Sequence, residues 1–206
     1  LDFGVAFDGD GDRCLMIDHT GAEIDGDDII TILAKFLNLD SIAVTVMANQ
    51  GLLNWAKENH IKTEITPVGD SNVASAMREK NIPIGGEQSG HIILPGESTG
   101  DGMLTSLMVA KAVTETGTPL SNIFTKLPQV IVNVEATPEQ KQSLKTSDAV
   151  KQLLFEYNQK LEKESGRLLV RPSGTEPLIR ITMWGNDENT ISNLANELKN
   201  KLRGVL

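Results

Sequence analysis

The sequence has little of what marks secreted, membrane-bound or nucleic-acid-binding proteins. It holds one cysteine, Cys14, so no disulfide can form within the chain, and we expect a reducing, cytoplasmic setting. Lys and Arg number 19 against 28 Asp and Glu, a net charge of -9. This acidic balance argues against a nucleic-acid partner, which needs a basic face. No apolar run approaches the length that spans a bilayer, so we expect no membrane partner.

The first residues also lack the basic and apolar regions of a signal peptide. The chain starts with Leu instead of Met and opens inside a strand-like pattern. We therefore expect that its start is a cut within a longer protein. Its 206 residues suit one large domain or two small ones, with 39% hydrophobic and 23% charged residues, an ordinary globular balance.

Strand-like and helix-like patterns alternate over the first part of the chain. Two short apolar runs, at 4–7 and 14–17, predict a hairpin around an acidic loop. A fully apolar run at 42–47 is typical of a buried parallel strand. Further patterns predict a strand at 61–66 and helices at 29–37, 52–59, 72–80 and 102–115. Together they predict a three-layer α/β domain.

The pattern changes after Pro128. It predicts strands at 129–135, 167–170 and 178–184, with helices at 147–163 and 188–202. Such an order over about 75 residues is typical of a small α+β domain. The expected linker, 118–129, contains two prolines. The predicted fold class is thus a leading hairpin from a preceding α/β domain, then a three-layer α/β domain, then a small α+β domain.

The loop at 8–13, DGDGDR, alternates three carboxylates with glycines after a strand. Glycines permit sharp turns, so Asp8, Asp10 and Asp12 can converge, and a hard cation then offsets their repulsion. An EF-hand is excluded, because Arg13 and His19 occupy the positions of its Gly and Glu. A solvated acidic turn stays open as the simpler alternative.

The loop at 85–91, GGEQSGH, predicts a site for polyhydroxylated ligands. In an extended segment Glu87, Ser89 and His91 point the same way, and together they can both donate to and accept from sugar hydroxyls. His91 can also transfer a proton near neutral pH. A glycine turn with a capping serine is the alternative for this loop taken alone.

The loop at 171–177, RPSGTEP, lies between two predicted strands and is followed by Arg180. It lacks the Gly-Lys-Ser/Thr ending that opens a helix, so it is not a P-loop. Two arginines beside Ser173 and Thr175 can nevertheless hold a phosphate. A plain hairpin turn is the alternative.

In this order, the three loops resemble those of the α-D-phosphohexomutase superfamily. Its members carry a DGDGDR metal loop, a GE-x-SGH sugar loop and an R-x-S-x-T phosphate loop, and the resemblance covers essentially the whole chain. The segment TGDG at 99–102 also resembles a family segment that opens a helix. Gln88 in the sugar loop, together with the RPSGTEP form of the phosphate loop, resembles the amino-sugar branch of the family. Phosphomannomutase/phosphoglucomutase relatives more often have Met at the position of Gln88.

The resemblance implies residues 1–18 as the end of domain two, 19–127 as domain three and 128–206 as domain four. It implies that a phosphoserine from an earlier domain, absent here, exchanges its phosphoryl group with the sugar through a bisphosphate. It further implies these roles: Asp8, Asp10 and Asp12 bind Mg²⁺; Arg13 and His91 are catalytic; Glu87, Ser89, Arg171, Ser173, Gly174, Thr175 and Arg180 bind the phosphosugar.

The implied reaction interconverts glucosamine-6-phosphate and glucosamine-1-phosphate, and this chain alone is expected to be inactive. The implied partners are the phosphosugar, the N-terminal half of the same enzyme and a second copy in a homodimer. The alternatives are a glucose- or mannose-phosphate mutase, or a non-catalytic phosphosugar-binding module. One departure bears on specificity, because Ser71 stands where the family usually has arginine.

Overall fold

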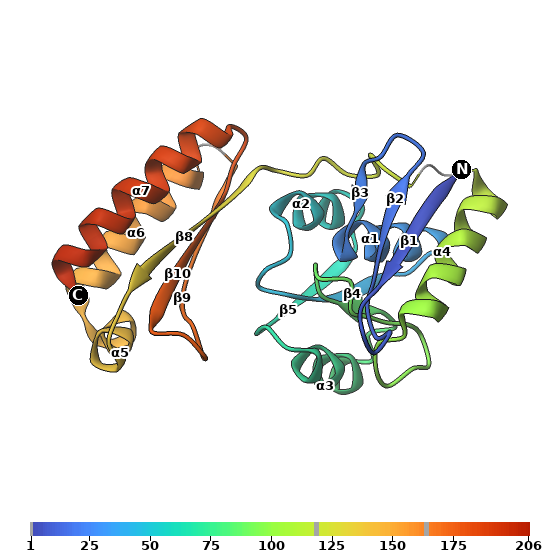
Figure 1. Cartoon of the computed structure of the whole chain (residues 1–206), viewed down its shortest axis with the longest axis horizontal. Coiled ribbons are helices and arrows are strands. Elements are labelled where there is room, and N and C mark those ends of the chain that lie inside the picture. Colours follow the sequence, from blue (N-terminus) through green and yellow to red (C-terminus); the bar gives the residue numbers. More distant parts are fainter. Residues whose placement is uncertain (1, 118–119, 163–164) are drawn as a thin grey trace. The chain divides into compact units, whose positions relative to one another are not determined.

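The chain divides into two compact units, Leu1–Lys126 and Leu127–Leu206, each with its own apolar core (Figure 1). The structure is a computed structural model and describes residues 2–117, 120–162 and 165–206. Parts of two expectations, namely Thr118 and Pro119 of the linker and Lys163 of a helix, lie outside the described residues. None of the helices in the described ranges has the length and apolarity that a bilayer crossing requires.

The first unit opens with a three-stranded antiparallel sheet, β1 (Phe3–Phe7), β2 (Cys14–Asp18) and β3 (Glu23–Ile24), in the order β1-β2-β3. The first two strands form the expected hairpin. The short β3 was not expected; it follows a turn that the Asp18 carboxylate holds by accepting from the Thr20 and Ala22 amides at 2.8 and 3.0 Å.

A second sheet lies at the centre of this unit, in the order β5-β4-β6-β7. Its strands are β4 (Ser41–Thr45), β5 (Lys62–Thr66), β6 (Gly85–Gly86) and β7 (Ile92–Ile93). β4 pairs in parallel with β5 and β6, and β7 returns antiparallel to β6. The apolar run of β4 is buried on both faces, as expected for a central parallel strand.

The sheet is covered by α1 (Gly26–Phe36), α2 (Gln50–Glu58) and α3 (Asp70–Lys80), while α4 (Gly102–Thr116) packs on α1 and on β2. On one face Ala43 shares a core cluster with Val73 and Met77 of α3. On the other face Ile42 and Val44 share a cluster with α1 and α2. The buried side of β2, Cys14 and Met16, joins this second cluster beside α4. The three-layer α/β prediction is confirmed.

Acidic caps set where two of these helices begin. α1 begins at Gly26, three residues before the expected start, because the Asp25 carboxylate accepts from the Asp27 and Asp28 amides. Asp28 reaches back to the Asp25 amide at 3.0 Å and completes a capping box. Asp101 caps α4 by accepting from the Leu104 amide at 2.9 Å.

The second unit is a three-stranded antiparallel sheet with helices on one face (Figure 1). The sheet order is β8-β10-β9, with β8 (Gln129–Glu135), β9 (Arg167–Pro172) and β10 (Leu178–Trp184). α6 (Asp148–Glu162) and α7 (Glu188–Val205) pack on the sheet around Tyr157 and Leu198, both fully buried. The expected α+β domain is therefore present.

One helix of this unit was not expected, α5 (Pro138–Thr146). Thr137 accepts from the Gln140 amide, Gln140 returns a contact to the Thr137 amide at 3.0 Å, and Pro138 occupies the first turn. The sequence therefore carried two helix-start signals. The helix has no buried residue, so it shows none of the apolar periodicity on which the prediction depended.

Candidate metal and phosphosugar loops

The acidic loop joins β1 to β2 and brings its three carboxylates together. One ligand oxygen from each of Asp8, Asp10 and Asp12 can be chosen so that all three lie within 4.8 Å of one another. Asp8 and Asp10 are exposed and Asp12 is half-buried, so the group faces solvent on one side. This convergence was expected from the alternating glycines. Gly11 contributes to it by adopting a φ of 73°, in the left-handed region that favours glycine.

Arg13 supplies the nearest positive charge. Its Nε lies 3.5 Å from Asp8 Oδ2 and 3.6 Å from Asp12 Oδ1, while its amide donates to Asp8 Oδ1 at 3.3 Å. Desolvation raises the pKa of Asp8, but the hydrogen bonds from Arg13 and Asp12 and the charge of Arg13 outweigh it and lower the pKa overall. Half of the Arg13 side chain remains exposed, so the guanidinium is accessible to a further anion.

The residues present fit a hard cation such as Mg²⁺. Asp12 Oδ1 is buried, and among the described residues no hydrogen-bond donor reaches it. A buried carboxylate oxygen without a donor is costly unless a cation approaches it. Three carboxylates are also the donor type that Mg²⁺ prefers. Arg13 alone, at 3.6 Å, is a loose partner for this oxygen.

The acidic loop is attached to the rest of its unit by backbone contacts. The Gly102 amide, at the start of α4, donates to Gly11 O at 2.9 Å, and the Cys14 amide donates to Gly90 O at 3.2 Å. A Cβ at Gly102 would lie 2.5 Å from Arg13 O, so only glycine permits this approach. The hairpin is thus packed on α4 and on the sugar loop, and Cys14 is buried.

The loop at 85–91 is a tight turn, and the extended segment that we expected is wrong for it. The Gly90 amide donates to Glu87 O, the Glu87 amide donates to His91 O, both at 3.0 Å, and Gly90 has a φ of 93°. The turn arises because Gly90 packs against Cys14 O, where a Cβ would lie at 2.2 Å. Glu87, Ser89 and His91 therefore do not point to one side by strand alternation.

Each polar side chain of this loop has a different environment. Glu87 is half-buried, and its Oε1 accepts from the Gly69 amide at 3.0 Å. Ser89 is exposed and borders a cavity of about 240 Å³ that Asp8 and Arg13 also line. His91 is 3% exposed and contacts Asp12, with Nδ1 3.1 Å from Oδ2. The structure thus brings the acidic loop and the sugar loop together.

Behind the sugar loop lies a buried acidic cluster, Asp25, Asp27 and Asp28, with Lys126. Lys126 Nζ lies 2.9 Å from Asp25 Oδ2 and 2.5 Å from Asp28 Oδ2, and Gln88 Nε2 lies 3.4 Å from Asp25 Oδ2. Burial raises the pKa of Asp27 to about 7, the Asp25 charge adds to this, and burial raises the pKa of Asp28 to about 6. These acids lie at the start of α1, where Asp25 is the N-cap and Asp27 and Asp28 are in the first turn.

Ser71 is exposed in the first turn of α3, with Arg78 two turns further along. Both border a cavity of about 270 Å³ whose wall also includes Ser98, Thr99 and His91. Arg78 therefore brings a guanidinium to this cavity. Ser71, which stands where the family usually has arginine, borders the same cavity.

The phosphate loop belongs to the second unit and links β9 to β10. Ser173 is buried, its amide donates to Leu178 O at 2.9 Å, and its Oγ accepts from the Glu176 amide at 3.2 Å. Gly174 and Thr175 are exposed at the tip. The loop is thus a hairpin turn, braced from within by one of its two hydroxyls.

Two arginines stand side by side at the base of this turn. Arg171 and Arg180 are direct partners in the β9–β10 ladder, a like-charge pair that favours an anion. Desolvation lowers the pKa of Arg171, and the neighbouring Arg180 charge adds to this. Arg180 bonds Glu176 through Nη2, while Arg171 Nε is buried without a hydrogen-bond partner in the described ranges.

Lys141 of α5 is a residue that the sequence prediction missed. Its Nζ donates to Ser173 O at 2.8 Å and to Glu176 O at 2.5 Å, and so connects α5 to the loop. The capping signal that starts α5 would have placed a lysine in its first turns. Nothing in the sequence tied that lysine to the phosphate loop.

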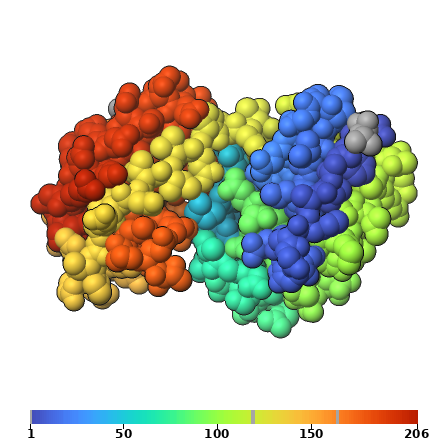
Figure 2. Space-filling model, viewed as in Figure 1, coloured from blue at the N-terminus to red at the C-terminus, as the bar shows by residue number. Residues whose placement is uncertain are grey.

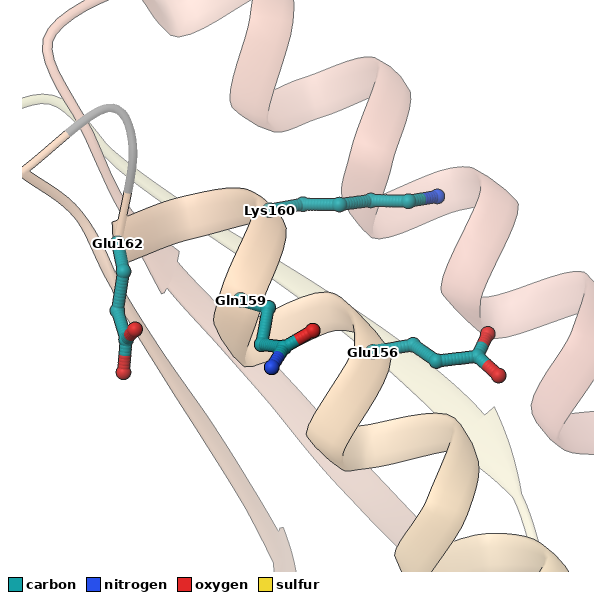
Figure 3. Close-up of a pocket in the computed structure, with 4 residues that line it drawn as sticks. All are labelled: Glu156, Gln159, Lys160 and Glu162. Carbon is teal, nitrogen blue, oxygen red and sulfur yellow. The ribbon is translucent and has the colours of Figure 1, made fainter.

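A larger hollow of about 630 Å³ lies on α6 and carries no site. It is lined by Glu156, Gln159, Lys160 and Glu162, all from one helix (Figure 3). In Figure 3 Lys160 extends toward α7, in keeping with its Nζ lying 3.7 Å from Glu197 Oε1, while the other three side chains diverge. Converging polar groups are what a binding pocket needs, and this hollow lacks them among its described lining residues.

The chain thus consists of an α/β unit that carries three converging aspartates and an α+β unit whose β9–β10 hairpin carries two neighbouring arginines. Residues 25–131 match the family described as phosphoglucomutase/phosphomannomutase, alpha/beta/alpha domain III. Residues 131–201 match the phosphoglucomutase/phosphomannomutase C-terminal domain. The chain belongs to the phosphoglucomutase/phosphomannomutase family.

Two of the most similar curated relatives share one description. The chain is 42% identical over 209 residues to the phosphoglucosamine mutase of Clostridium perfringens strain SM101, covering 97% of this chain and 46% of the relative. It is 44% identical over 210 residues to that of Natranaerobius thermophilus, covering 96% and 46%. The chain thus spans about half the length of the curated relatives it matches.

Solved structures share the fold. The Aspergillus fumigatus N-acetylphosphoglucosamine mutase in complex with GlcNAc-6P and magnesium has a TM-score of 0.78 at 20% identity, over 95% of this chain and 51% of that one. A Burkholderia thailandensis phosphoglucomutase/phosphomannomutase family protein has a TM-score of 0.75 at 19% identity, over 99% and 47%.

Proposed function

We propose that this chain is the cation- and phosphosugar-binding half of a phosphoglucosamine mutase. The observation that carries the proposal is the convergence of Asp8, Asp10 and Asp12 beside Arg13, packed directly against the sugar loop. The curated relatives, at 42–44% identity, support the amino-sugar substrate. The reaction proposed for the longer protein interconverts glucosamine-6-phosphate and glucosamine-1-phosphate.

In this proposal the three aspartates hold Mg²⁺, and the ion supplies charge neutralisation for a phosphoryl group in transfer. Arg13, half-exposed beside them, faces the same phosphoryl group and stabilises its oxygens. Ser89 and Glu87 bind sugar hydroxyls, and the exposure of Ser89 beside the cavity that Asp8 and Arg13 line supports this role. His91 is the residue proposed from the family resemblance for proton transfer.

The phosphate that does not react is proposed to bind the loop of the second unit. The buried, unpaired Nε of Arg171 and the like-charged neighbour Arg180 support this role, because an anion relieves both costs. The exposed tip, Gly174 and Thr175, offers backbone amides and a hydroxyl to the same anion, and Ser173 shapes the turn.

The phosphoserine is proposed to come from the N-terminal half of the same enzyme, so that the present chain alone is inactive. The test compares the purified chain with the longer protein encoded together with its upstream sequence. Both receive Mg²⁺, a hexose bisphosphate activator and, in turn, glucosamine-, glucose- or mannose-6-phosphate. Turnover of glucosamine-6-phosphate by the longer protein alone supports the proposal, and preference for another sugar selects the alternative mutases.

Binding without turnover in the longer protein would instead support a non-catalytic phosphosugar-binding module. A cytoplasmic location is part of the proposal, supported by the single buried cysteine. The homodimer also stays a prediction, which sedimentation of the longer protein tests directly.

A further inference from the structure

The hairpin that links β9 to β10 carries a carboxylate of its own beside the two arginines. Glu176 lies four residues before Arg180, and its Oε2 forms an ion pair with Arg180 Nη2. The two side chains are 50% and 36% exposed, so the pair lies where a dissolved anion can reach it. An anion that binds Arg180 therefore has to compete with Glu176 for the same guanidinium.

The second arginine of the hairpin lacks such a partner. Arg171 is the partner of Arg180 in the β9–β10 ladder, and its Nε is buried without a hydrogen-bond partner in the described ranges. Desolvation lowers the pKa of Arg171 and the Arg180 charge adds to this, so the charged form is destabilised. One carboxylate thus compensates only part of the charge of two adjacent guanidiniums, and the pair still favours an anion.

The backbone of Glu176 holds the turn, and the carboxylate takes no part in this. The Glu176 amide donates to Ser173 Oγ at 3.2 Å. Its carbonyl accepts from Lys141 Nζ at 2.5 Å and from the Leu178 amide at 2.8 Å. In the described part of the chain, Arg180 is the only ion-pair partner of the carboxylate. The side chain can therefore turn away from Arg180 without any change to these hydrogen bonds.

The charges at the loop match those of a phosphate monoester only when Glu176 is counted. Arg171, Arg180 and Lys141 bring three positive charges to the loop. Glu176 brings one negative charge, so the excess is two (3 - 1). A phosphate monoester carries about −1.5 to −2 at neutral pH. Without the carboxylate the loop would exceed the charge of its ligand, whereas a phosphosugar that has to leave after turnover needs a moderate affinity.

We propose that the Glu176 carboxylate competes with the ligand phosphate: it occupies Arg180 in the empty loop and is displaced when a phosphate binds. The inference rests on the phosphate-binding role that this loop has in the proposed function. Because the ion pair is partly exposed, its removal should strengthen phosphate binding by about two- to fivefold and not by orders of magnitude. Glu176 thereby sets how tightly the loop holds its ligand.

The first experiment titrates the chain with inorganic phosphate at neutral pH and follows ¹H–¹⁵N correlation spectra. Salt at about 0.1 M screens charges more than about 10 Å away, so that local effects dominate. We expect Glu176→Gln to bind phosphate about two- to fivefold more tightly than the unmodified chain. Glu156→Gln, at an exposed position of α6, makes the same change in net charge and should leave the affinity unchanged. Unchanged or weaker binding by Glu176→Gln refutes the inference.

The second experiment determines whether the gain depends on Arg180. In an Arg180→Met background the carboxylate has no guanidinium to release, so Glu176→Gln should no longer strengthen phosphate binding. A gain of the same size in that background would mean that the carboxylate only repels the ligand or alters the turn. Competition for Arg180 would then be excluded.

A further variant separates the inference from the proposal beneath it. Arg171→Ala should weaken phosphate binding by the chain about tenfold or more if the loop is the phosphate site. If the affinity stays unchanged, the phosphate role of the loop is refuted, and the role of Glu176 with it. A loss for Arg171→Ala without a gain for Glu176→Gln refutes the competition alone. A loss for Arg171→Ala together with a gain that requires Arg180 supports both.

Discussion

Replacing Asp27 by Asn should make the first unit more stable at neutral pH, and more so as the pH rises. Asp27 is fully buried in the first turn of α1. Its Oδ2 accepts from the Asn49 amide at 2.7 Å, while burial and the Asp25 charge raise its pKa from 3.8 to about 7. The folded state therefore holds a proton that the unfolded chain has already released.

The sign follows from proton linkage. Stability from this group is fully present below the unfolded pKa of 3.8 and is lost as pH rises through the folded value of about 7. A difference of about three pKa units corresponds to about 4 kcal/mol at about 1.4 kcal/mol per unit. Asn carries no such ionisation, and one of its atoms can still accept from the Asn49 amide. Its unmatched NH₂ costs about 1–3 kcal/mol, independent of pH.

The measurement is the free energy of unfolding of the first unit by urea at pH 5, 6 and 7. Trp55 packs against the core of the first unit and Trp184 is buried in the second. In a Trp184→Phe background, fluorescence therefore follows the first unit alone. The stability of Asp27→Asn relative to its parent should rise by about 1.4 kcal/mol per pH unit over this range.

Asp28 titrates nearby, with a pKa raised to about 6, and so adds its own slope to both proteins, which the difference removes. Asp40→Asn, at an exposed turn, is the control and should show no pH-dependent difference. If Asp27→Asn and its parent have parallel curves from pH 5 to 7, Asp27 does not titrate there, and the argument from burial fails.

Three further predictions concern the loops. Asp10→Asn should weaken Mn²⁺ binding by the chain about tenfold or more, because one of three ligand charges is lost; unchanged affinity by calorimetry would contradict this. Arg171→Ala in the longer protein should raise KM for the phosphosugar about tenfold with kcat nearly kept, and a loss confined to kcat would exclude a grip on the non-reacting phosphate. Lys141→Met should weaken inorganic phosphate binding about three- to tenfold, since two contacts that shape the loop are lost. The exposed Lys145→Met is its control in the same titration, and equal effects would rule out a role for Lys141.

The fold class and most element positions could be predicted because buried elements leave an apolar period in the sequence. β8 and β10 lie where they were expected: β8 alternates half-buried or buried with exposed positions from Val130 to Glu135, and β10 is buried from Ile181 to Trp184. α5 was missed because it has no fully buried residue and is held by its cap and by the Lys141 contacts. Local hydrogen bonds fixed this helix, whereas the prediction relied on burial.

The candidate site shows the same division. The convergence of the three aspartates follows from local chain geometry, so the motif was enough to predict it. The conformation of the sugar loop depends on Gly90 approaching Cys14, which is 76 positions away in sequence (90 - 14), and the surroundings of His91 depend on Gly100 and Asp12. Contacts between distant segments of this kind have no signature in one sequence.

The hairpin that carries the acidic loop has one consequence for handling the protein. β1 pairs only with β2 among the described residues, so its outer edge offers unpaired amides and carbonyls. Val5 and Phe7 on this strand and Ile17 on its neighbour are 37%, 47% and 50% exposed, and the hairpin lies at the surface (Figure 2). An open, apolar strand edge is a template for the same strand of another molecule. At high concentration the isolated chain should therefore self-associate through β1, and a charged residue at Val5 would keep it dispersed.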